Sequence, residues 1–443
     1  MDPPLSRLDA VGDSDLAEWR SLVVSPLLLL TGSNISREMR RAAKGRHLRR
    51  RPFARLWVGS TIASTGDGLM LGAVPLLAVA VNPHPVAVSA VAACDSVPWL
   101  FMALPAGAFA DRFERGPLMA LCNVLRALAI LAAALLILDG DMRLWILIVV
   151  VLVNSSGRAV YYSSYQAIVP TLVETDALER ANGILTGTEA GAEHLAGPIV
   201  GTSMFAAAAS LPFFADAITM ILSSLPLVRL RAKAREVPQS RTSMWEGIRL
   251  LFSDRRLRVL VVIVSALAAL QGMETGVLVL LATNLWGVRT GAYGVFLAAG
   301  AVGNLLGSVL TERVVGRFGS ASTLIGTAVV SGLAYLVMAA AHGWQLAAPA
   351  YFVSGMVVAM LSVAAISLRQ RLTPSDLMGR VGSAWRGVVW GTAPIGALFA
   401  GVLAALGGLR LPIFLAGALQ ILVAVVFARP LFRSIREGVQ PAQ

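Results

Sequence analysis

The sequence predicts an all-α membrane protein with twelve transmembrane helices in two pseudo-symmetric six-helix halves. Three observations predict this fold class: the composition, the number of long apolar runs and an internal repeat. Of 443 residues, 56% are hydrophobic and 14% are charged, with a mean hydropathy of +0.73, which is more apolar than a soluble domain. The net charge of +12 does not indicate nucleic acid, because basic residues alternate with apolar spans. We therefore expect a lipid bilayer partner and no nucleic acid.

Twelve apolar stretches have about the 20 residues that a helix needs to cross a bilayer. The first six cover residues 57–81, 86–110, 117–138, 144–167, 181–208 and 211–230. The other six cover residues 259–285, 292–310, 321–341, 346–368, 381–406 and 411–428. Basic residues gather in alternate loops, and the remaining loops hold only Arg143, Arg289 and Arg410. Because cytoplasmic loops are enriched in Lys and Arg, we expect a cytoplasmic-membrane protein with both termini cytoplasmic.

Composition divides the chain into five segments. Their expected bounds are 1–51 for a polar and basic cytoplasmic tail, 52–230 for the first half, 231–257 for a basic linker, 258–430 for the second half and 431–443 for a cytoplasmic tail. Within the linker, apolar residues at helical spacing over 243–254 predict a helix on the membrane surface. The tail contains no signal peptide pattern, and the membrane pattern starts just after Met39, so a translation start at Met39 is one hypothesis.

An internal repeat relates the fifth span to the eleventh. Gly183, Gly191 and Pro198 recur 196 residues later as Gly379, Gly387 and Pro394. Two six-helix repeats are the build of secondary transporters whose halves rock around a central site. No metal-ligand spacing, cofactor motif, nucleotide-binding motif or catalytic triad pattern stands out, so we expect no cofactor, no metal and no enzyme activity. A gradient must then drive transport.

Several motifs occur in order along almost the whole chain. The run Gly107-Ala-Phe-Ala-Asp-Arg-Phe-Glu-Arg115 has the form G-x-x-x-D-R-x-x-R, and Ser64-Thr-Gly-Asp-Gly-Leu69, Gly197-Pro-Ile-Val-Gly201 and Gly272-Met-Glu274 lie on the expected spans. With these motifs the chain resembles the major facilitator superfamily, and within it the drug–proton antiporter branch that includes enterobactin exporters and macrolide-efflux proteins. The resemblance implies the major facilitator fold and export. The helix-five signature of that branch is incomplete, with Glu193 and Thr202 at two of its glycine positions.

Ionisable residues at membrane depth are costly and are functional candidates by default. We expect proton or substrate coupling at Asp67, Glu274, Glu189, Glu193, Arg158 and Arg126. Gly66 and Gly68 flank Asp67, and we expect them to leave its backbone loosely held. Asp95, Asp216 and Arg386 are further charged residues in spans, and His194 is interpreted as a packing residue.

Glu189 and Glu193 are four residues apart, so they lie on one helix face and would repel each other. Arg158 and Arg126 are the expected counter-ions, in a structural Glu–Arg network or beside a cationic substrate. Glu274 lies on the seventh helix, the counterpart of the first helix in the repeat, so we expect it to play the same role as Asp67.

A gate latch is predicted where the second helix ends. Asp111 follows a helix whose C-terminus is already negative, so its carboxylate needs an outside partner. In the two-repeat architecture that partner is the N-terminus of helix eleven at Arg380, which offers free N–H groups. The latch residues are Gly107, Asp111, Arg112, Arg115 and Arg380. The second copy of the loop has Thr311 in place of the aspartate and should latch weakly.

Aromatic residues and small-residue ladders complete the candidates. The possible pocket for an apolar ligand consists of Trp99, Tyr161, Tyr162, Tyr165, Trp385 and Trp390. Glycines four residues apart predict close helix packing, which also permits sliding between the halves. These glycines are Gly183, Gly187, Gly191, Gly303, Gly307, Gly387 and Gly391.

The sequence therefore predicts a monomeric secondary transporter that exports a small amphipathic molecule in exchange for protons by alternating access. A dedicated siderophore or metabolite exporter of the same fold is the first alternative. A membrane scaffold or sensor without transport activity is the alternative from another class.

Overall fold

A computed structural model describes residues 50–174, 177–230, 244–374 and 377–436, and these residues are helical almost throughout. The expectations for the N-terminal tail and for Met39 lie outside the described residues. The first half contains α3 (Arg50–Val81), α4 (Pro85–Arg112), α5 (Arg115–Leu138), α6 (Leu144–Leu172), the composite helix α7 (Leu178–Ala190), η4 (Gly191–Ala196) and α8 (Gly197–Ala207), and α9 (Leu211–Val228).

The second half repeats this order. It contains α11 (Arg255–Leu280) with η5 (Leu281–Leu285), the short η6 (Thr290–Ala292), α12 (Tyr293–Phe318), α13 (Ser320–Ala340), α14 (Trp344–Leu372), α15 (Met378–Trp390) with α16 (Ala393–Gly407), and α17 (Arg410–Arg436). A short helix, α10 (Met244–Ser253), precedes α11 and packs against α15 and α11.

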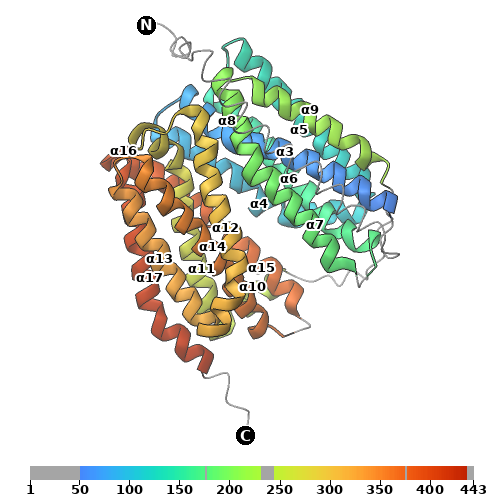
Figure 1. Ribbon diagram of the computed structural model, residues 1–443. Helices are drawn as coiled ribbons and strands as arrows, with labels where there is room; N and C mark the ends of the chain where they lie inside the picture. The colour runs from blue at the N-terminus through green and yellow to red at the C-terminus, as the bar shows by residue number, and fades with distance from the viewer. Residues whose placement is uncertain (1–49, 175–176, 231–243, 375–376, 437–443) are drawn as a thin grey trace.

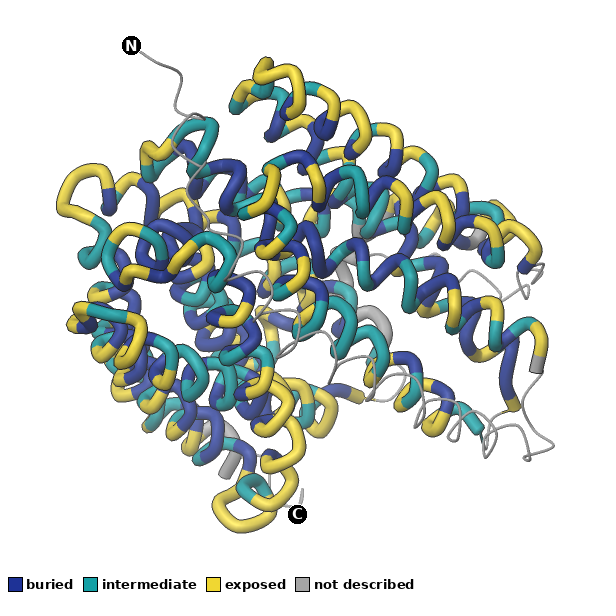
Figure 2. The backbone as a smooth tube through the Cα atoms, turned by 45° about the horizontal axis from the view of Figure 1, so that its top comes forward, coloured by how far each residue is buried: buried dark blue, intermediate teal, exposed yellow. Residues whose placement is uncertain are grey.

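Eleven helices of the described residues are long and apolar enough to cross a membrane. The composite helix of α7, η4 and α8 is the twelfth predicted span and is not among these eleven. It carries Glu189 and Glu193 near its middle, which makes it the most polar of the predicted spans. Large apolar side chains are exposed along the outer faces of the helices, for example Leu121, Leu125 and Leu128 on α5, and such a stripe suits contact with lipid. Figure 2 shows this alternation of exposed and buried positions along the helices.

The two halves pack their helices in the same way. In the first half α4 packs on α6, α5 on α9, and α3 on α8 and α9. In the second half α12 packs on α14, α13 on α17, and α11 on α16 and α17. Between the halves, α4 packs on α16 and α8 on α12, which are equivalent pairs in the repeat. The fold is therefore two six-helix bundles related by pseudo-symmetry.

The halves meet closely at one end of the molecule. We call this end, where α3 ends and α4 begins, the sealed end, and the end where α3 begins and α17 ends the terminal end. One buried apolar cluster at the sealed end includes residues of both halves, whereas the clusters toward the terminal end belong to one half each. Figure 1 accordingly shows two bundles that adjoin at the upper left and diverge toward the right and the bottom of the view.

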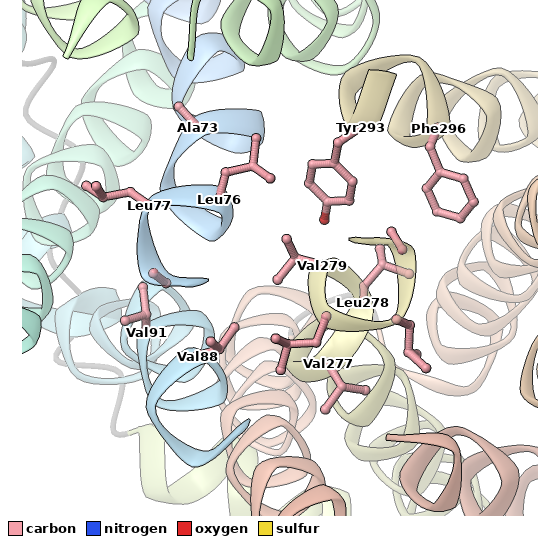
Figure 3. Close-up of a cluster of buried hydrophobic side chains, with 14 of the residues drawn as sticks. Ala73, Leu76, Leu77, Val88, Val91, Val277, Leu278, Val279, Tyr293 and Phe296 are labelled. Atoms are coloured by element: carbon pink, nitrogen blue, oxygen red, sulfur yellow. The ribbon is translucent and has the colours of Figure 1, made fainter. Parts of the chain in front are cut away.

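The seal is built by the apolar ends of four helices. Figure 3 shows Ala73, Leu76 and Leu77 of α3, Val88 and Val91 of α4, Val277, Leu278 and Val279 of α11, and Tyr293 and Phe296 of α12. These side chains are all nine-tenths or more buried, so water is excluded between the halves at this end.

Prolines distort the two helices that the repeat relates. A proline ring clashes with the carbonyl four residues earlier and removes an N–H group from the helix ladder. Before Pro198 the composite helix widens into the π-helical η4, and before Pro394 the chain breaks between α15 and α16. Both distortions lie at the depth of the charged and aromatic residues described below.

Candidate functional site

Asp67 of α3 pairs with arginines from two other helices. Its Oδ1 accepts a hydrogen bond from Nη2 of Arg126 on α5, and its Oδ2 lies 3.9 Å from Nε of Arg158 on α6. The side chain of Arg126 is 1% exposed and that of Asp67 is 10% exposed. A buried ion pair of this kind costs about 3–5 kcal/mol to break by removing one partner, because the other charge is left uncompensated. Asp67 therefore holds α3, α5 and α6 together.

The other two nitrogen atoms of Arg126 also form hydrogen bonds. Its Nε donates to Oδ1 of Asn154 at 2.8 Å, and its Nη1 to Oδ1 of Asn123 at 3.4 Å. Asn123 in turn donates from Nδ2 to the hydroxyl of Ser223 on α9 at 2.8 Å. These linked polar side chains fix the guanidinium plane of Arg126 inside the first half, so Arg126 can change position only if its hydrogen-bond partners move with it.

Arg158 links the same carboxylate to the π-helical segment. Its Nη2 donates to Oε1 of Glu193, while Nε lies near Asp67. Of the two counter-ions predicted for the glutamate pair, Arg158 contacts Glu193, whereas Arg126 contacts Asp67. Glu189 lies beside the hydroxyl of Tyr165 and interacts electrostatically with Glu193. The two glutamates are therefore neighbours, as their spacing predicts, but they have different partners.

The glycines that flank Asp67 permit close helix packing. A Cβ atom on Gly68 would lie 2.7 Å from the carbonyl oxygen of Ala192 and 2.8 Å from that of Glu193. A Cβ on Gly66 would overlap the carboxylate of Asp216 on α9. We expected these glycines to loosen the backbone around Asp67; the structure corrects this, because they bring α3 against η4 and α9, and larger residues would push the carboxylate out of place.

Five carboxylates of the first half interact around only two arginines. Asp95, Glu189 and Asp216 each interact electrostatically with Asp67, and Asp95 and Glu189 also interact with Glu193. The cations beside them are Arg126 and Arg158. Asp95 is exposed, and no hydrogen bond or ion pair of its carboxylate with a described residue is found. Asp216 is fully buried, and its Oδ2 has no hydrogen-bond partner among the described residues. The cluster therefore holds more acidic groups than cationic ones.

Glu274 of α11 is the corresponding carboxylate of the second half, and its surroundings are different. It is 4% exposed, and its Oε2 accepts a hydrogen bond from the hydroxyl of Tyr335 on α13. Tyr293 and Tyr351 lie within electrostatic reach, and no arginine or lysine of the described residues pairs with it. Its Oε1 has no hydrogen-bond partner among the described residues. Glu274 is thus a buried acid in a tyrosine pocket with one oxygen left unpaired.

A cavity of about 370 Å³ opens between α4 of the first half and the helices of the second half. Trp99 and Trp390 line it, and their rings meet edge to face with centroids 5.8 Å apart. Tyr162 packs edge-on against Trp99 at 5.7 Å. The other aromatic candidates do not line this cavity: Tyr161 and Tyr165 are buried in the core of the first half, and Trp385 is buried in that of the second.

The comparisons with known proteins agree with this geometry. Residues 45–441 match the family MFS_3, described as Transmembrane secretion effector, which is nearly the whole chain. The chain belongs to the major facilitator superfamily. It is a secondary transporter of the secretion effector family and not an enzyme. It is 24% identical over 385 residues to the MFS-type transporter YfiS of Bacillus subtilis (strain 168), a match that covers 84% of this chain and 91% of YfiS.

Solved structures show the same fold at low identity. The nucleoside transporter NupG superposes with a TM-score of 0.69 at 14% identity, covering 86% of this chain and 98% of that chain. A bacterial homologue of the iron transporter ferroportin in its inward-facing state superposes with a TM-score of 0.68 at 18% identity, covering 86% of this chain and 98% of that chain. A bacterial homologue of the human lysosomal transporter Spinster, in an inward-facing and occupied conformation, superposes with a TM-score of 0.69 at 12% identity, covering 87% of this chain and 96% of that chain.

In this transporter the predicted latch lies at the terminal end, where the halves diverge. The side chains of Asp111 and Arg380 lie outside the described residues, so their pairing stays a prediction. Arg112 is exposed, whereas Arg115 is buried and donates to carbonyl oxygens of the first half, from Nη1 to Ala167 at 2.7 Å and from Nε to Ala110 at 3.4 Å. Arg115 therefore ties the end of α4 to α6.

The small-residue ladders differ in the space they face. Cβ atoms on Gly303 and Gly307 of α12 would overlap backbone atoms of α14, so these glycines allow close packing, as predicted. Cβ atoms on Gly183, Gly187 and Gly191 would meet nothing within 4 Å. The ladder on α7 is therefore not a packing surface in this conformation, and it lies on the side of the transporter that is open.

Sequence reasoning missed a polar contact between the halves. Thr202 of α8 is fully buried; it accepts a hydrogen bond from the amide of Gly294 on α12 at 3.1 Å and lies 3.2 Å from the carbonyl oxygen of Gly291. The signal was present, because Thr202 occupies a glycine position of the antiporter signature. The tyrosines around Glu274 were also missed, since they come from three separate helices.

Proposed function

We propose that this transporter exports a small amphipathic compound in exchange for protons, as in the drug–proton antiporter branch that its motifs resemble. The observation that carries the proposal is the excess of acidic over basic groups inside the bundle, where two of the acidic groups, Asp216 and Glu274, are buried. Two arginines face five carboxylates in the first half, and Glu274 stands in the second half without a cation among the described residues. An uncompensated buried carboxylate is costly, and binding a proton removes that cost.

The carboxylates divide into two roles in this proposal. Asp67 and Glu193 are held by arginines, so they form the framework that rearranges when the halves rock. Glu274 accepts a hydrogen bond from Tyr335, and Glu189 lies beside the hydroxyl of Tyr165. Neither forms an ion pair with a described residue, so each can take up or release a proton without separating one. Protonation at these two positions alters the charge beside the helices that form the seal.

The conformation also fits this cycle. With both termini in the cytoplasm, the sealed end faces the outside and the diverging end faces the cytoplasm, where an export substrate enters. Closing the terminal end and opening the seal would expose the cavity to the outside, as alternating access requires. The latch of Asp111 with the start of α15 would then hold the terminal end closed.

The test is transport in inverted membrane vesicles energised by a proton gradient, with a panel of drugs and siderophores. We expect substrate movement that an uncoupler abolishes. Glu189→Gln and Glu274→Gln should lose gradient-driven accumulation but keep exchange of labelled for unlabelled substrate, because alternation persists without proton release. Glu312→Gln, an exposed glutamate on α12, is the matched control and should behave as the unaltered protein.

Three outcomes would count against the proposal. Accumulation that resists the uncoupler would exclude proton exchange, and unchanged accumulation in both glutamine variants would exclude these two proton carriers. No movement of any compound in the panel would favour a membrane scaffold or sensor. Selective movement of siderophores alone would instead favour the dedicated exporter.

A further inference from the structure

The cavity between the halves has a lining that is chemically distinct from the acidic cluster. Most of its wall comes from the second half, from α11, α13, α14, α15, α16 and α17, and α4 contributes Ser96 and Trp99 from the first half. Its volume of about 370 Å³ falls in the range of pockets that hold small organic ligands. The cavity is therefore large enough for a substrate of the proposed function.

No charged side chain lines this cavity among the described residues. The polar lining consists of hydroxyl and amide groups, which are those of Ser96, Gln271, Thr275, Ser331, Ser362 and Gln420. A buried ionic group needs an opposite charge or several hydrogen bonds from charged partners to offset its lost hydration. This lining provides neutral donors and acceptors instead, so it favours an uncharged ligand.

Two of these polar groups lack partners. Oγ of Ser331 on α13 and Oε1 of Gln420 on α17 form no hydrogen bond with described residues, although the two residues are only 2% and 3% exposed. Buried polar groups in folded proteins are almost always hydrogen-bonded, and an unpaired one costs free energy until something binds it. Both residues line the cavity. Their unpaired oxygens have almost no exposed surface, so a ligand forms hydrogen bonds with them only after neighbouring side chains shift.

Another part of the lining is aromatic. Trp99 and Trp390 come from different halves and meet edge to face, with Tyr162 against Trp99. Trp390 is 47% exposed, so its ring has a free face. Aromatic rings of this kind bind planar apolar groups and add orientation to the contact.

We infer that this cavity binds an uncharged compound with a planar aromatic body and a hydroxyl or amide group, which hydrogen-bonds Ser331 and Gln420 while the ring packs against Trp99 and Trp390. The inference rests on the proposed function and specifies its substrate class. It also separates two tasks: the neutral cavity selects the substrate, and the acidic groups outside its lining carry protons.

The test is equilibrium dialysis of the purified full chain in detergent against five labelled probes. Chloramphenicol, adenosine and 2,3-dihydroxybenzamide are uncharged aromatic compounds with hydroxyl or amide groups; ethidium is a permanent cation and fluorescein an anion. We expect at least one uncharged probe to bind and neither charged probe to do so. Ser331→Ala/Gln420→Leu should weaken that binding by about tenfold, since two hydrogen bonds are lost.

The control variant is Ser308→Ala/Gln370→Leu, which makes the same changes at exposed positions and should leave binding unaltered. If Ser331→Ala/Gln420→Leu, the cavity variant, does not fold, the preference of the unaltered protein for uncharged over charged probes still tests the inference. Binding of none of the uncharged probes, stronger binding of ethidium or fluorescein, or unchanged binding in the cavity variant would each overturn the inference.

Dialysis measures binding without transport, so the two proposals can fail separately. If an uncharged probe binds through Gln420 but its transport ignores the proton gradient, only the proposed coupling is wrong. If gradient-driven transport is found for ethidium alone, the coupling stands and the inferred substrate class is wrong.

Discussion

Removing the hydroxyl of Thr202 should weaken the sealed end of the transporter. Thr202 belongs to α8 of the first half, yet it accepts a hydrogen bond from Gly294 in the first turn of α12 in the second half. Amides in the first turn of a helix lack acceptors within that helix, and the residue before α12, Ala292, provides no side-chain cap. Thr202 therefore caps α12 from across the interface between the halves.

The size of the effect follows from this geometry. Thr202→Val keeps the side-chain shape but leaves the buried amide of Gly294 without its acceptor, which costs about 1–3 kcal/mol. The cost applies only while the seal is closed, since water can reach the amide when it opens. The equilibrium should therefore shift toward opening of this end by roughly 5- to 150-fold. Thr202→Ser retains the hydroxyl and is the matched control.

The assay is a distance measurement between spin labels by electron paramagnetic resonance. Labels on cysteines at Pro83 and Arg289 lie on exposed positions of the two halves at the sealed end, after Cys94 and Cys122 are replaced by alanine. We expect Thr202→Val to add a population with longer distances, which Thr202→Ser lacks. Identical distance distributions in the two variants would refute the reasoning, because the hydroxyl would then contribute nothing to the seal.

Two further predictions concern the open end and the acidic cluster. Gly187→Leu should fold normally, since a Cβ there faces open space, but it should stop transport because the larger side chain blocks closure of the terminal end. Gly307→Leu should instead lower the melting temperature, because a Cβ there would overlap the carbonyl of Met356. In denaturation experiments, Asp67→Asn should lower the free energy of unfolding by about 3–5 kcal/mol, because Arg126 loses its buried partner. The double variant Asp67→Asn/Arg126→Met should recover part of that loss. A double variant no more stable than Asp67→Asn would contradict the pairing.

Much of the fold was predictable because bilayer thickness and backbone hydrogen bonding restrict a spanning chain to long apolar helices. The recurrence of Pro198 as Pro394 then indicated two halves. The sequence also placed Glu189 and Glu193 on one face correctly. The π-helical distortion before Pro198 was less predictable, since a proline in a helix can cause a kink, a break or a bulge, and packing decides which one forms.

The pairing of charges could not be predicted to the same degree. Arg126 was a candidate counter-ion of the glutamates, but its carboxylate is Asp67, which lies 59 residues away in the chain. The spacing of Gly183 and Gly187 predicted packing, whereas both face open space in this conformation. A sequence must satisfy every conformation of the transport cycle, so a pattern can be correct for a state that is not the one observed.

One of the two candidate proton carriers, Glu274, lies on a helix of the seal, which gives a physical route for coupling. Glu274 precedes Val277 of the seal by three residues on α11, a rise of roughly 4.5 Å, and Tyr293 belongs both to the surroundings of Glu274 and to the seal. In the first half, Asp67 precedes Ala73 by six residues on α3, a rise of roughly 9 Å. A change of charge at Glu274, or a rearrangement of the ion pairs of Asp67, therefore acts on a helix whose next turns form the closed end. In this proposal Glu189 acts through the Asp67 network, whereas Glu274 lies on α11 within electrostatic reach of Tyr293 of the seal. The second half should therefore respond to a proton more directly than the first.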